Sequence, residues 1–352
     1  MADFSLPICR GRFLAVEALM THCNVIVIGA SAGGVSSLTA LVSMLPQELP
    51  AAMAVALHVP EESTSSLPQI LTRGGALRAT HAVDREPLLH GRIYVAPPGH
   101  HLLVKRHNMR VVKGPNENGH RPAVDPLFRT AARAHGRRVL GVVLSGSLDD
   151  GTAGLLAIKE HGGRALVQDP NDAMFAGMPQ SAIENVLVDF VGDVPAVANE
   201  LVRLVDVLAS SADEPEPRSD GADELDAVEI EAGNLHPEQW TAVPSPFSCP
   251  ECHGVLFERP DGTLERFRCR TGHAYSAESL VAAQSKGLDE ALWIALRALE
   301  ENAALLQRLA KRAHDRQHVR SSERFQSQAR AMEARAQIVR DVLRSGGDPV
   351  VA

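Results

Sequence analysis

Long apolar runs and aromatic residues are both scarce in this sequence. Its longest apolar segments, over residues 25–32 and 51–57, fall well short of the roughly 18 residues that a membrane-spanning helix requires. Aromatic residues make up 4% of the chain, whereas hydrophobic residues reach 45% and Ala, Val and Leu are abundant. These proportions exclude direct membrane insertion and favour an α/β core in which the short apolar segments form buried strands.

Clustered positive charge is missing as well. The formal net charge is -8, and residues 213–231 contain nine acidic residues and one arginine, so this segment accounts for the whole imbalance. The rest of the chain is close to neutral and shows no basic face that would neutralise phosphates. We therefore expect no nucleic-acid partner.

Cysteine is sparse, and its distribution does not suit disulfide bonds. Three of the five cysteines fall within residues 249–269, while Cys9 and Cys23 stand alone. This pattern is typical of a metal site in a reducing compartment. The first nineteen residues lack the continuous apolar stretch of a secretory signal, so we expect a cytoplasmic protein.

Changes of composition along the chain predict five regions. At 352 residues the chain is too long for one ordinary core. The stretch 210–246 is rich in Pro, Asp, Glu and Ser and cannot bury enough apolar area to offset the entropy of ordering. The regions are an N-terminal leader (1–22), an α/β domain (23–208), an acidic disordered linker (209–246), a zinc-ribbon-like module (247–282) and a helical hairpin or coiled coil (283–346).

The α/β domain is predicted from the alternation of apolar and helical segments. Strands are expected at 24–29, 52–58, 92–96, 138–144, 164–168 and 186–190, and helices at 35–45, 125–135, 151–161 and 193–208. Such alternation indicates a doubly wound, mostly parallel sheet of Rossmann-like three-layer form with helices on both faces. Segments 102–104 and 109–112 predict an inserted hairpin.

The first strand runs directly into Gly29-Ala30-Ser31-Ala32-Gly33, which matches the G-x-S-x-G nucleophile elbow. A helix follows, and its first N–H groups would face negative charge that develops near Ser31. A glycine-rich phosphate-binding turn is the alternative interpretation. A dinucleotide-binding loop would want an acid at the end of the second strand, but here that strand ends in His58, which favours a hydrolase.

A serine nucleophile needs a base, and the base needs an orienting acid. His58 lies at the end of the second strand, within plausible reach of Ser31, because parallel strands place their carboxyl ends side by side. The acid should follow another strand, and both Asp149 and Asp150 come after the apolar segment 138–144. The residues alone leave these two open, since the chain order Ser, His, Asp differs from that of ordinary α/β hydrolases.

Taken together, several motifs resemble the catalytic domain of the CheB chemotaxis protein-glutamate methylesterases over residues 24–207. They are Ile28-Gly29-Ala30-Ser31-Ala32-Gly33-Gly34, His58-Val59-Pro60, Ala96-Pro97-Pro98-Gly99, His120-Arg121-Pro122 with Asp125, Leu144-Ser145-Gly146 with Asp150-Gly151, and Gly177-Met178-Pro179. The resemblance implies Ser31 as nucleophile, His58 as base and Asp150, rather than Asp149, as orienting acid. It also implies hydrolysis of glutamate methyl esters on methyl-accepting chemoreceptors without a catalytic cofactor.

Two features depart from that family. Its familiar members carry a phosphoaccepting receiver domain ahead of the esterase, whereas only about twenty residues precede the first strand here, so we expect a stand-alone esterase under other control. The partners that this resemblance implies are a methylated chemoreceptor-like protein and other signalling proteins. Glutamine deamidation is a further expected activity, since it passes through the same acyl-enzyme. His120 and Arg121 either line the cleft or belong to a structural loop.

The second departure is a zinc-ligand spacing after the linker. Cys249 and Cys252 are separated by two residues, Cys269 follows after sixteen, and His273 after three more. Two such knuckles can supply a closed tetrahedron, so we predict structural Zn²⁺ rather than a hydrolytic metal. His253 is an alternative ligand. Phe247, Leu256, Phe257 and Phe267 would form a core too small to be stable without metal.

Apolar residues near a 3.5-residue spacing predict two helices at the end of the chain. The first set is Leu288, Leu292, Ala295, Leu299, Leu306 and Leu309, and the second is Phe325, Ala329, Met332, Ala336, Val339 and Leu343. The helices would pair with each other or form a coiled coil, and one hypothesis is that they bind a receptor's helical bundle. Two other functions compete with the esterase: a catalytically silent signalling scaffold that acts through its zinc ribbon and helices, and a nucleotide-binding module.

Overall fold

The computed structural model describes residues 24–210, 243–258 and 264–345, which divide into two compact units, 1–279 and 280–352. Each unit is described by itself below. The predicted leader over 1–22 and most of the predicted acidic linker, residues 211–242, lie outside the described residues.

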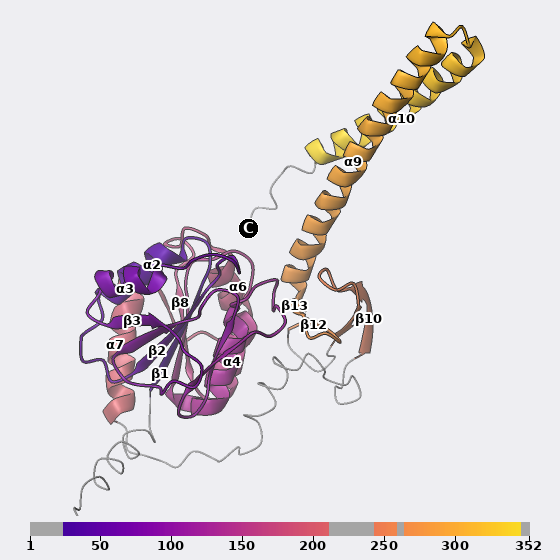
Figure 1. The fold of residues 1–352 in the computed structure, drawn as a ribbon. Helices are drawn as coiled ribbons and strands as arrows, with labels where there is room; N and C mark the ends of the chain where they lie inside the picture. The colour runs from indigo at the N-terminus through magenta and orange to yellow at the C-terminus, as the bar shows by residue number, and fades with distance from the viewer. Residues whose placement is uncertain (1–23, 211–242, 259–263, 346–352) are drawn as a thin grey trace, which may run out of the picture. The chain divides into compact units, whose positions relative to one another are not determined.

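A seven-stranded parallel sheet forms the centre of the first unit (Figure 1). The strand order is β3-β4-β2-β1-β7-β8-β9, and every neighbouring pair is parallel. The strands are β1 (Val25–Ala30), β2 (Ala52–Leu57), β3 (Arg78–His81), β4 (Arg92–Val95), β7 (Val139–Val143), β8 (Arg164–Gln168) and β9 (Phe190–Gly192). This arrangement confirms the predicted doubly wound α/β fold.

Alternating side chains of the central strands fill two separate hydrophobic cores. Val25 and Val27 of β1 face one core, and Ile26 and Ile28 face the other, since successive residues of a strand point to opposite faces. Helices cover both faces, as Figure 1 shows. Helices α2 (Gly34–Ser43), α3 (Leu67–Gly74) and α7 (Val194–Ser210) lie on one side, and α4 (Val124–His135), α5 (Thr152–Glu160) and α6 (Gly177–Asn185) lie on the other.

Strand β1 is the topological switch point of the sheet. It pairs with β2 on one side and with β7 on the other, so the chain leaves it in opposite directions. Ligand sites of open α/β sheets lie outside the carboxyl ends of the strands at such a point. The loops after β1, β2 and β7 therefore meet where a site is expected.

The edges of the sheet differ in detail from the sequence prediction. Strand β3 was not predicted, because its residues Arg-Ala-Thr-His are mostly polar. The strand predicted at 186–190 is wrong: Leu187 is 85% exposed and β9 begins at Phe190. The inserted hairpin is confirmed, with β5 (His101–Val104) antiparallel to β6 (Met109–Val112).

The cysteine-containing segment forms a small antiparallel sheet within the first unit. Its strands are β10 (Val243–Ser248), β11 (Val255–Glu258), β12 (Arg266–Cys269) and β13 (Ala274–Ser276). Leu256, Phe257 and Phe267 are buried as predicted. Phe247 is 40% exposed, which corrects its predicted core position, and Tyr275 is buried in its place. We call this segment, residues 243–279, the Cys/His module.

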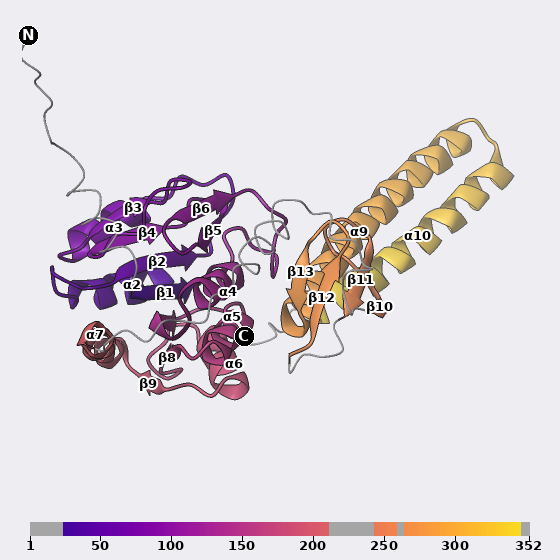
Figure 2. The same ribbon diagram turned by 90° about the horizontal axis from the view of Figure 1, so that it is seen from below.

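The second unit contains most of α9 (Ala277–Asp315) and all of α10 (Val319–Ser345), which lie antiparallel, as Figure 2 shows. The predicted stripe of α10 is covered, but that of α9 is wrong in part because Leu288 is 61% exposed. Ala303 and Ala310 are buried instead. Leu296 is buried as well, so the buried positions of α9 lie seven residues apart and one residue after the predicted Ala295 and Leu309. In the described part of the chain, no helix combines the length and apolarity needed to cross a membrane.

Candidate active site

The turn after β1 presents Ser31 at the edge of the sheet, and its glycines are sterically required. A Cβ atom at Gly29 would come within 2.2 Å of the Val124 side chain on α4. Gly33 has a φ of 73°, and a Cβ there would come within 2.7 Å of Ser145 Oγ. The Ser31 N–H donates a hydrogen bond to the Ser145 carbonyl at 3.0 Å. The turn is therefore fixed against the loop that follows β7.

Ser31, His58 and Asp150 lie in one hydrogen-bonded chain. His58 Nδ1 is 3.0 Å from Ser31 Oγ, and His58 Nε2 is 2.7 Å from Asp150 Oδ2. The three residues follow β1, β2 and β7, as the switch-point topology predicts. The side chains of His58 and Asp150 are 6% and 2% exposed, whereas Ser31 is partly accessible. His58 and Asp150 are thus sheltered from solvent, while Ser31 at the end of the chain remains accessible.

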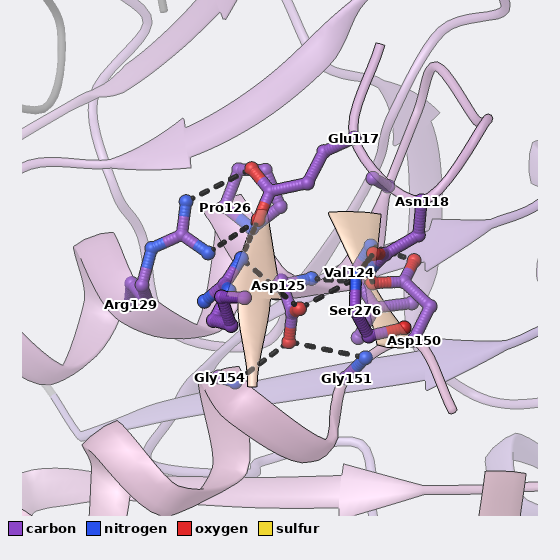
Figure 3. A network of polar contacts seen from close by, with 12 residues as sticks. Glu117, Asn118, Val124, Asp125, Pro126, Arg129, Asp150, Gly151, Gly154 and Ser276 are labelled. Carbon is purple, nitrogen blue, oxygen red and sulfur yellow. Dashed lines mark hydrogen bonds and ion pairs between the residues drawn. The ribbon is translucent and has the colours of Figure 1, made fainter. Parts of the chain in front are cut away.

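Asp150 is held as a buried carboxylate by several donors (Figure 3). The Val124 N–H donates to Oδ2 at 2.7 Å, and Asn118 Nδ2 donates to Oδ1 at 2.8 Å. Burial acts to raise the pKa of Asp150, but the hydrogen bond and charge of His58 and these N–H groups outweigh burial and lower the pKa to about 2. The ionised carboxylate only accepts, so His58 carries its proton on Nε2 and leaves Nδ1 free to accept from Ser31.

Asp149, the other candidate acid, points away from this chain. Its Oδ1 accepts hydrogen bonds from Ser276 Oγ at 2.7 Å and Ser279 Oγ at 2.9 Å, both in the Cys/His module. Burial raises the pKa of Asp149. The structure therefore brings Asp150, and not Asp149, to His58.

His120 packs against the base. Its ring stacks on the His58 ring with centroids 3.7 Å apart and an interplanar angle of 15°. Burial and, to a smaller extent, the neighbouring His58 together lower the pKa of His120 to about 4 against the opposing effect of Asp150, so His120 is neutral at pH 7. Arg121 pairs with Glu61 at 2.8 Å. His120 thus lies at the site, while Arg121 supports the loop beside it.

A second carboxylate network lies behind Asp150, and the sequence analysis missed two of its members, Glu117 and Asn118. Asp125 Oδ1 accepts hydrogen bonds from the N–H groups of Gly151 at 3.1 Å and Gly154 at 2.6 Å, at the start of α5. Glu117 forms a two-fold ion pair with Arg129, at 2.7 and 3.0 Å. The spacing Glu117-Asn118 ahead of His120 gave only a weak signal, since polar residues in a loop are usually solvated.

Three backbone N–H groups near Ser31 have no acceptor among the described residues, namely those of Ala32, Gly33 and Ser147. Helix α2 begins at Gly34 and carries no acidic residue in its first turn, so its positive end remains uncompensated. The loop of Ser147 is close, because a Cβ atom at Gly146 would come within 2.9 Å of Ser31 Cβ. These N–H groups are therefore the candidate donors to negative charge that develops at Ser31.

The four residues with zinc-ligand spacing come together in the Cys/His module. The ligand atoms of Cys249, Cys252, Cys269 and His273 all lie within 4.8 Å of one another. Cys252 Sγ is 3.5 Å from Cys269 Sγ, and His273 Nδ1 is 3.5 Å from Cys269 Sγ and 3.6 Å from Cys249 Sγ. The edges of a ZnS₃N tetrahedron measure roughly 3.5–3.8 Å, and a disulfide would need about 2 Å, so the geometry fits a metal.

The surroundings of His273 also suit a metal ligand. Its other ring nitrogen, Nε2, lies 3.1 Å from Glu251 Oε2, and a carboxylate at this position fixes the orientation of a ligating imidazole. Tyr275 donates to Glu251 Oε1 at 2.8 Å. His253, the alternative ligand, is absent from the cluster, and its backbone closes the first knuckle by donating to the Cys249 carbonyl at 2.8 Å.

Comparisons with known proteins agree on the family of this domain. The CheB methylesterase family model matches residues 26–201. A protein-glutamate methylesterase/protein-glutamine glutaminase 2 of Xanthomonas euvesicatoria is 37% identical over 205 residues, covering 57% of this chain and 57% of its own length. A putative protein-glutamate methylesterase/protein-glutamine glutaminase of Leptospira interrogans is 37% identical over 180 residues, covering 51% of this chain and 93% of that protein.

A solved structure agrees with these relatives. The CheB methylesterase catalytic domain of Thermotoga maritima is 32% identical, with a TM-score of 0.50, and the match covers 52% of this chain and 98% of that domain. The chain spans little more than half the length of the Xanthomonas relative, and the shared part is the parallel-sheet domain. This chain belongs to the CheB methylesterase family.

Proposed function

We propose that this protein is a serine esterase that hydrolyses the methyl esters of glutamate side chains on other proteins. The observation that carries the proposal is the hydrogen-bonded chain from Ser31 through His58 to Asp150, at the switch point of the sheet. The names of the relatives support the same chemistry. A fully connected Ser-His-Asp chain does not favour a catalytically silent scaffold.

In the proposed mechanism, His58 Nδ1 takes the proton of Ser31 while Oγ attacks the ester carbonyl. Asp150 stays ionised and stabilises the imidazolium through Nε2. The N–H groups of Ala32, Gly33 and Ser147 are the proposed donors to the oxyanion, each contributing about 3 kcal/mol. Protonated His58 then transfers this proton to the methoxide oxygen, so that methanol leaves and the acyl-enzyme forms. Water hydrolyses the acyl-enzyme with His58 again as base.

Glutamine deamidation is proposed as a second reaction of the same site. A glutamine side chain presents the same carbonyl, and attack by Ser31 would give the same glutamyl ester with ammonia as the leaving group. The relatives from Xanthomonas and Leptospira carry both activities in their names. The amide is the poorer substrate, because amine loss requires full proton transfer from His58 before the bond breaks.

The proposed substrate is a methylated chemoreceptor-like protein in the cytoplasm. Met174 and Phe175 border the nucleophile turn and are 70% and 40% exposed. Met174 lies over the turn, because a Cβ atom at Gly33 would come within 2.9 Å of Met174 Cβ. This apolar lip can hold the backbone segment that carries the esterified glutamate, as exposed apolar groups at a polar site commonly contact a protein substrate.

The proposed cofactor is structural Zn²⁺ at Cys249, Cys252, Cys269 and His273, with none needed for hydrolysis. Four protein ligands would close the site to a reactive water. Mass spectrometry of the native protein should find one zinc per chain. Cys252→Ser should lower the zinc content. Val255→Ala, at a position of the same module that is 52% exposed, serves as the control.

Methanol release from a methylated bacterial chemoreceptor tests the proposed activity. The intact protein should release methanol, and Ser31→Ala should release none above background. Labelling by a fluorophosphonate in parallel should modify the intact protein at Ser31. Methanol release that persists in Ser31→Ala would contradict the assignment of the nucleophile. Labelling without methanol release would keep the hydrolase and reject the receptor substrate.

A further inference from the structure

The Cys/His module contacts the catalytic domain directly behind Asp150. Strand β13 lies along residues 116–118: the Asn118 N–H donates to the Ala274 carbonyl at 2.7 Å, and the Ala274 N–H donates to the Asn116 carbonyl at 3.2 Å. The Ser276 N–H donates to Asn118 Oδ1 at 2.9 Å. The segment ahead of His120 is therefore paired with the strand that follows the ligand His273.

Asn118 joins this strand to the catalytic carboxylate (Figure 3). Its Nδ2 donates to Asp150 Oδ1 at 2.8 Å and to Asp125 Oδ2 at 3.2 Å, while its Oδ1 accepts from Ser276. An amide has its donors on one atom and its acceptor on the other, so the bond from Ser276 fixes which atom faces Asp150. The Cys/His module thereby sets the orientation of the Asn118 amide, which in turn donates to Asp150.

Arg266 supplies positive charge from the module to the same place. Glu117, Asp125 and Asp150 are each at most 3% exposed. Arg129 pairs with Glu117 from within the catalytic domain, and Arg266 of β12 pairs with Glu117 and lies 3.6 Å from Asp125 Oδ2. Burial raises the pKa of Asp125 to about 7 even though Arg266 opposes the rise. Without Arg266, the buried carboxylates would lose one of the cations that compensate their charge, leaving Arg129 and the more distant Arg268.

The ligand cluster connects to these contacts through Glu251. Its carboxylate lies against His273 Nε2 at 3.1 Å and accepts a hydrogen bond from Asn116 Nδ2 at 3.2 Å. Strands β12 and β13, which carry Arg266 and Ser276, are joined by the turn between Cys269 and His273. The geometry of this turn depends on what holds Cys269 and His273 together, since the module buries few apolar side chains.

We propose that the metal-loaded Cys/His module positions the acid of the esterase. Zn²⁺ fixes β12 and β13, so that Arg266 holds Asp125 and Ser276 holds Asn118 behind Asp150. The proposal rests on the esterase and zinc site proposed above. It makes Arg266 a positioning residue and makes zinc occupancy a regulator of the esterase. Outer partners of this kind change activity by about 10–100-fold.

The test compares the full chain with zinc, the same chain after chelation, and Arg266→Gln, Arg266→Lys and Arg270→Gln. Arg270 is the matched control, because it lies in the same module and its guanidinium contacts only the Phe257 ring among the described contacts. Three properties are measured: zinc per chain, the rate at which a fluorophosphonate labels Ser31, and the low-field proton resonance of the His58 Nε2–H bonded to Asp150. The resonance reports the triad whether or not an ester is hydrolysed.

Chelation should weaken or shift the resonance and slow labelling about 10–100-fold, and added Zn²⁺ should restore both. Arg266→Gln should also shift the resonance and slow labelling, although it retains its zinc. Arg266→Lys should recover part of the labelling rate, and Arg270→Gln should match the unaltered protein. Unchanged resonance and labelling in zinc-free protein would overturn the proposal, and so would an unaltered rate in zinc-loaded Arg266→Gln. A zinc-dependent resonance in a chain that never labels would instead reject the esterase and keep the positioning role.

Discussion

The groups around Asp150 come from two regions that are stabilised in different ways. The parallel sheet buries an apolar core on each face, and helices cover both faces. In the described part of the Cys/His module, burial rests on a few side chains, among them Leu256, Phe267 and Tyr275, together with the ligands Cys249 and Cys269. Ser31 and His58 therefore belong to a fold with a large apolar core, whereas one support of Asp150 comes from a small region that we propose to be stabilised by metal.

The largest expected effect is on the rate of ester hydrolysis, and it should occur without unfolding either region. Asp150→Asn replaces the acceptor of the His58 Nε2–H and favours the wrong imidazole tautomer. We expect the rate of methanol release to fall about 10⁴-fold. Thermal unfolding and zinc content, measured on the same preparation, should change little. A loss below tenfold would show that Asp150 does not orient His58.

The second prediction separates the two sources of stability. Ile28 is fully buried in β1, so Ile28→Ala should lower the free energy of unfolding of the sheet domain by about 3 kcal/mol. Denaturant unfolding followed by hydrogen exchange should show the loss in the sheet, with zinc retained. Removal of zinc by a chelator should have the opposite effect: hydrogen exchange should increase in β10–β13, while the core of the seven-stranded parallel sheet should stay protected. An equal increase of hydrogen exchange in both regions after chelation would show that the two regions do not differ in their dependence on metal.

A third, smaller effect depends on pH and concerns the sheet domain. The pKa of His120 is about 4 in the folded protein and 6.5 in its ordinary state, so the unfolded chain binds a proton first as pH falls. The free energy of unfolding should therefore decrease between pH 6.5 and 4, by about 2 kcal/mol from this residue. Urea unfolding of His120→Phe should show a weaker dependence, and exposed His161→Gln should match the unaltered protein. An equal slope in all three would contradict the assignment.

The smallest effect concerns substrate size. Met174→Ala removes exposed apolar surface beside Ser31, and we expect KM for a methylated receptor to rise about fivefold, equivalent to about 1 kcal/mol. Hydrolysis of a small methyl ester should be unchanged, since such an ester does not reach the lip. Steady-state kinetics with both substrates makes the comparison, and Leu187→Ala, at another exposed apolar position, is the control.

The sequence predicted the central strands and the meeting of Ser31 with His58, because apolar periodicity and the switch-point rule can be applied to a single chain. The choice of Asp150 over Asp149 came from the resemblance to the family. The sequence also predicted that Cys249, Cys252, Cys269 and His273 come together, because the spacing of each ligand pair is itself a local pattern. It missed Glu117, Asn118 and the role of Arg266, since their partners lie on segments up to 158 residues away and no local pattern encodes such pairing. The buried face of α9 was misplaced by one residue because apolar residues lie on several faces of this helix, with Leu288 and Ile294 both 61% exposed.

Asn118 has one more consequence, which concerns the chemical lifetime of the protein. It is followed by Gly119, and asparagine is a thermolabile residue whose side chain can deamidate by reaction with the next backbone N–H, which a following glycine leaves open. The hydrogen bonds to Asp150, Asp125 and Ser276 immobilise the side chain and keep it from its own backbone. Conversion to aspartate would add a fourth carboxylate to the cluster and remove a donor from Asp150. Ageing at this single position would therefore inactivate stored enzyme, and faster when the module is loosened.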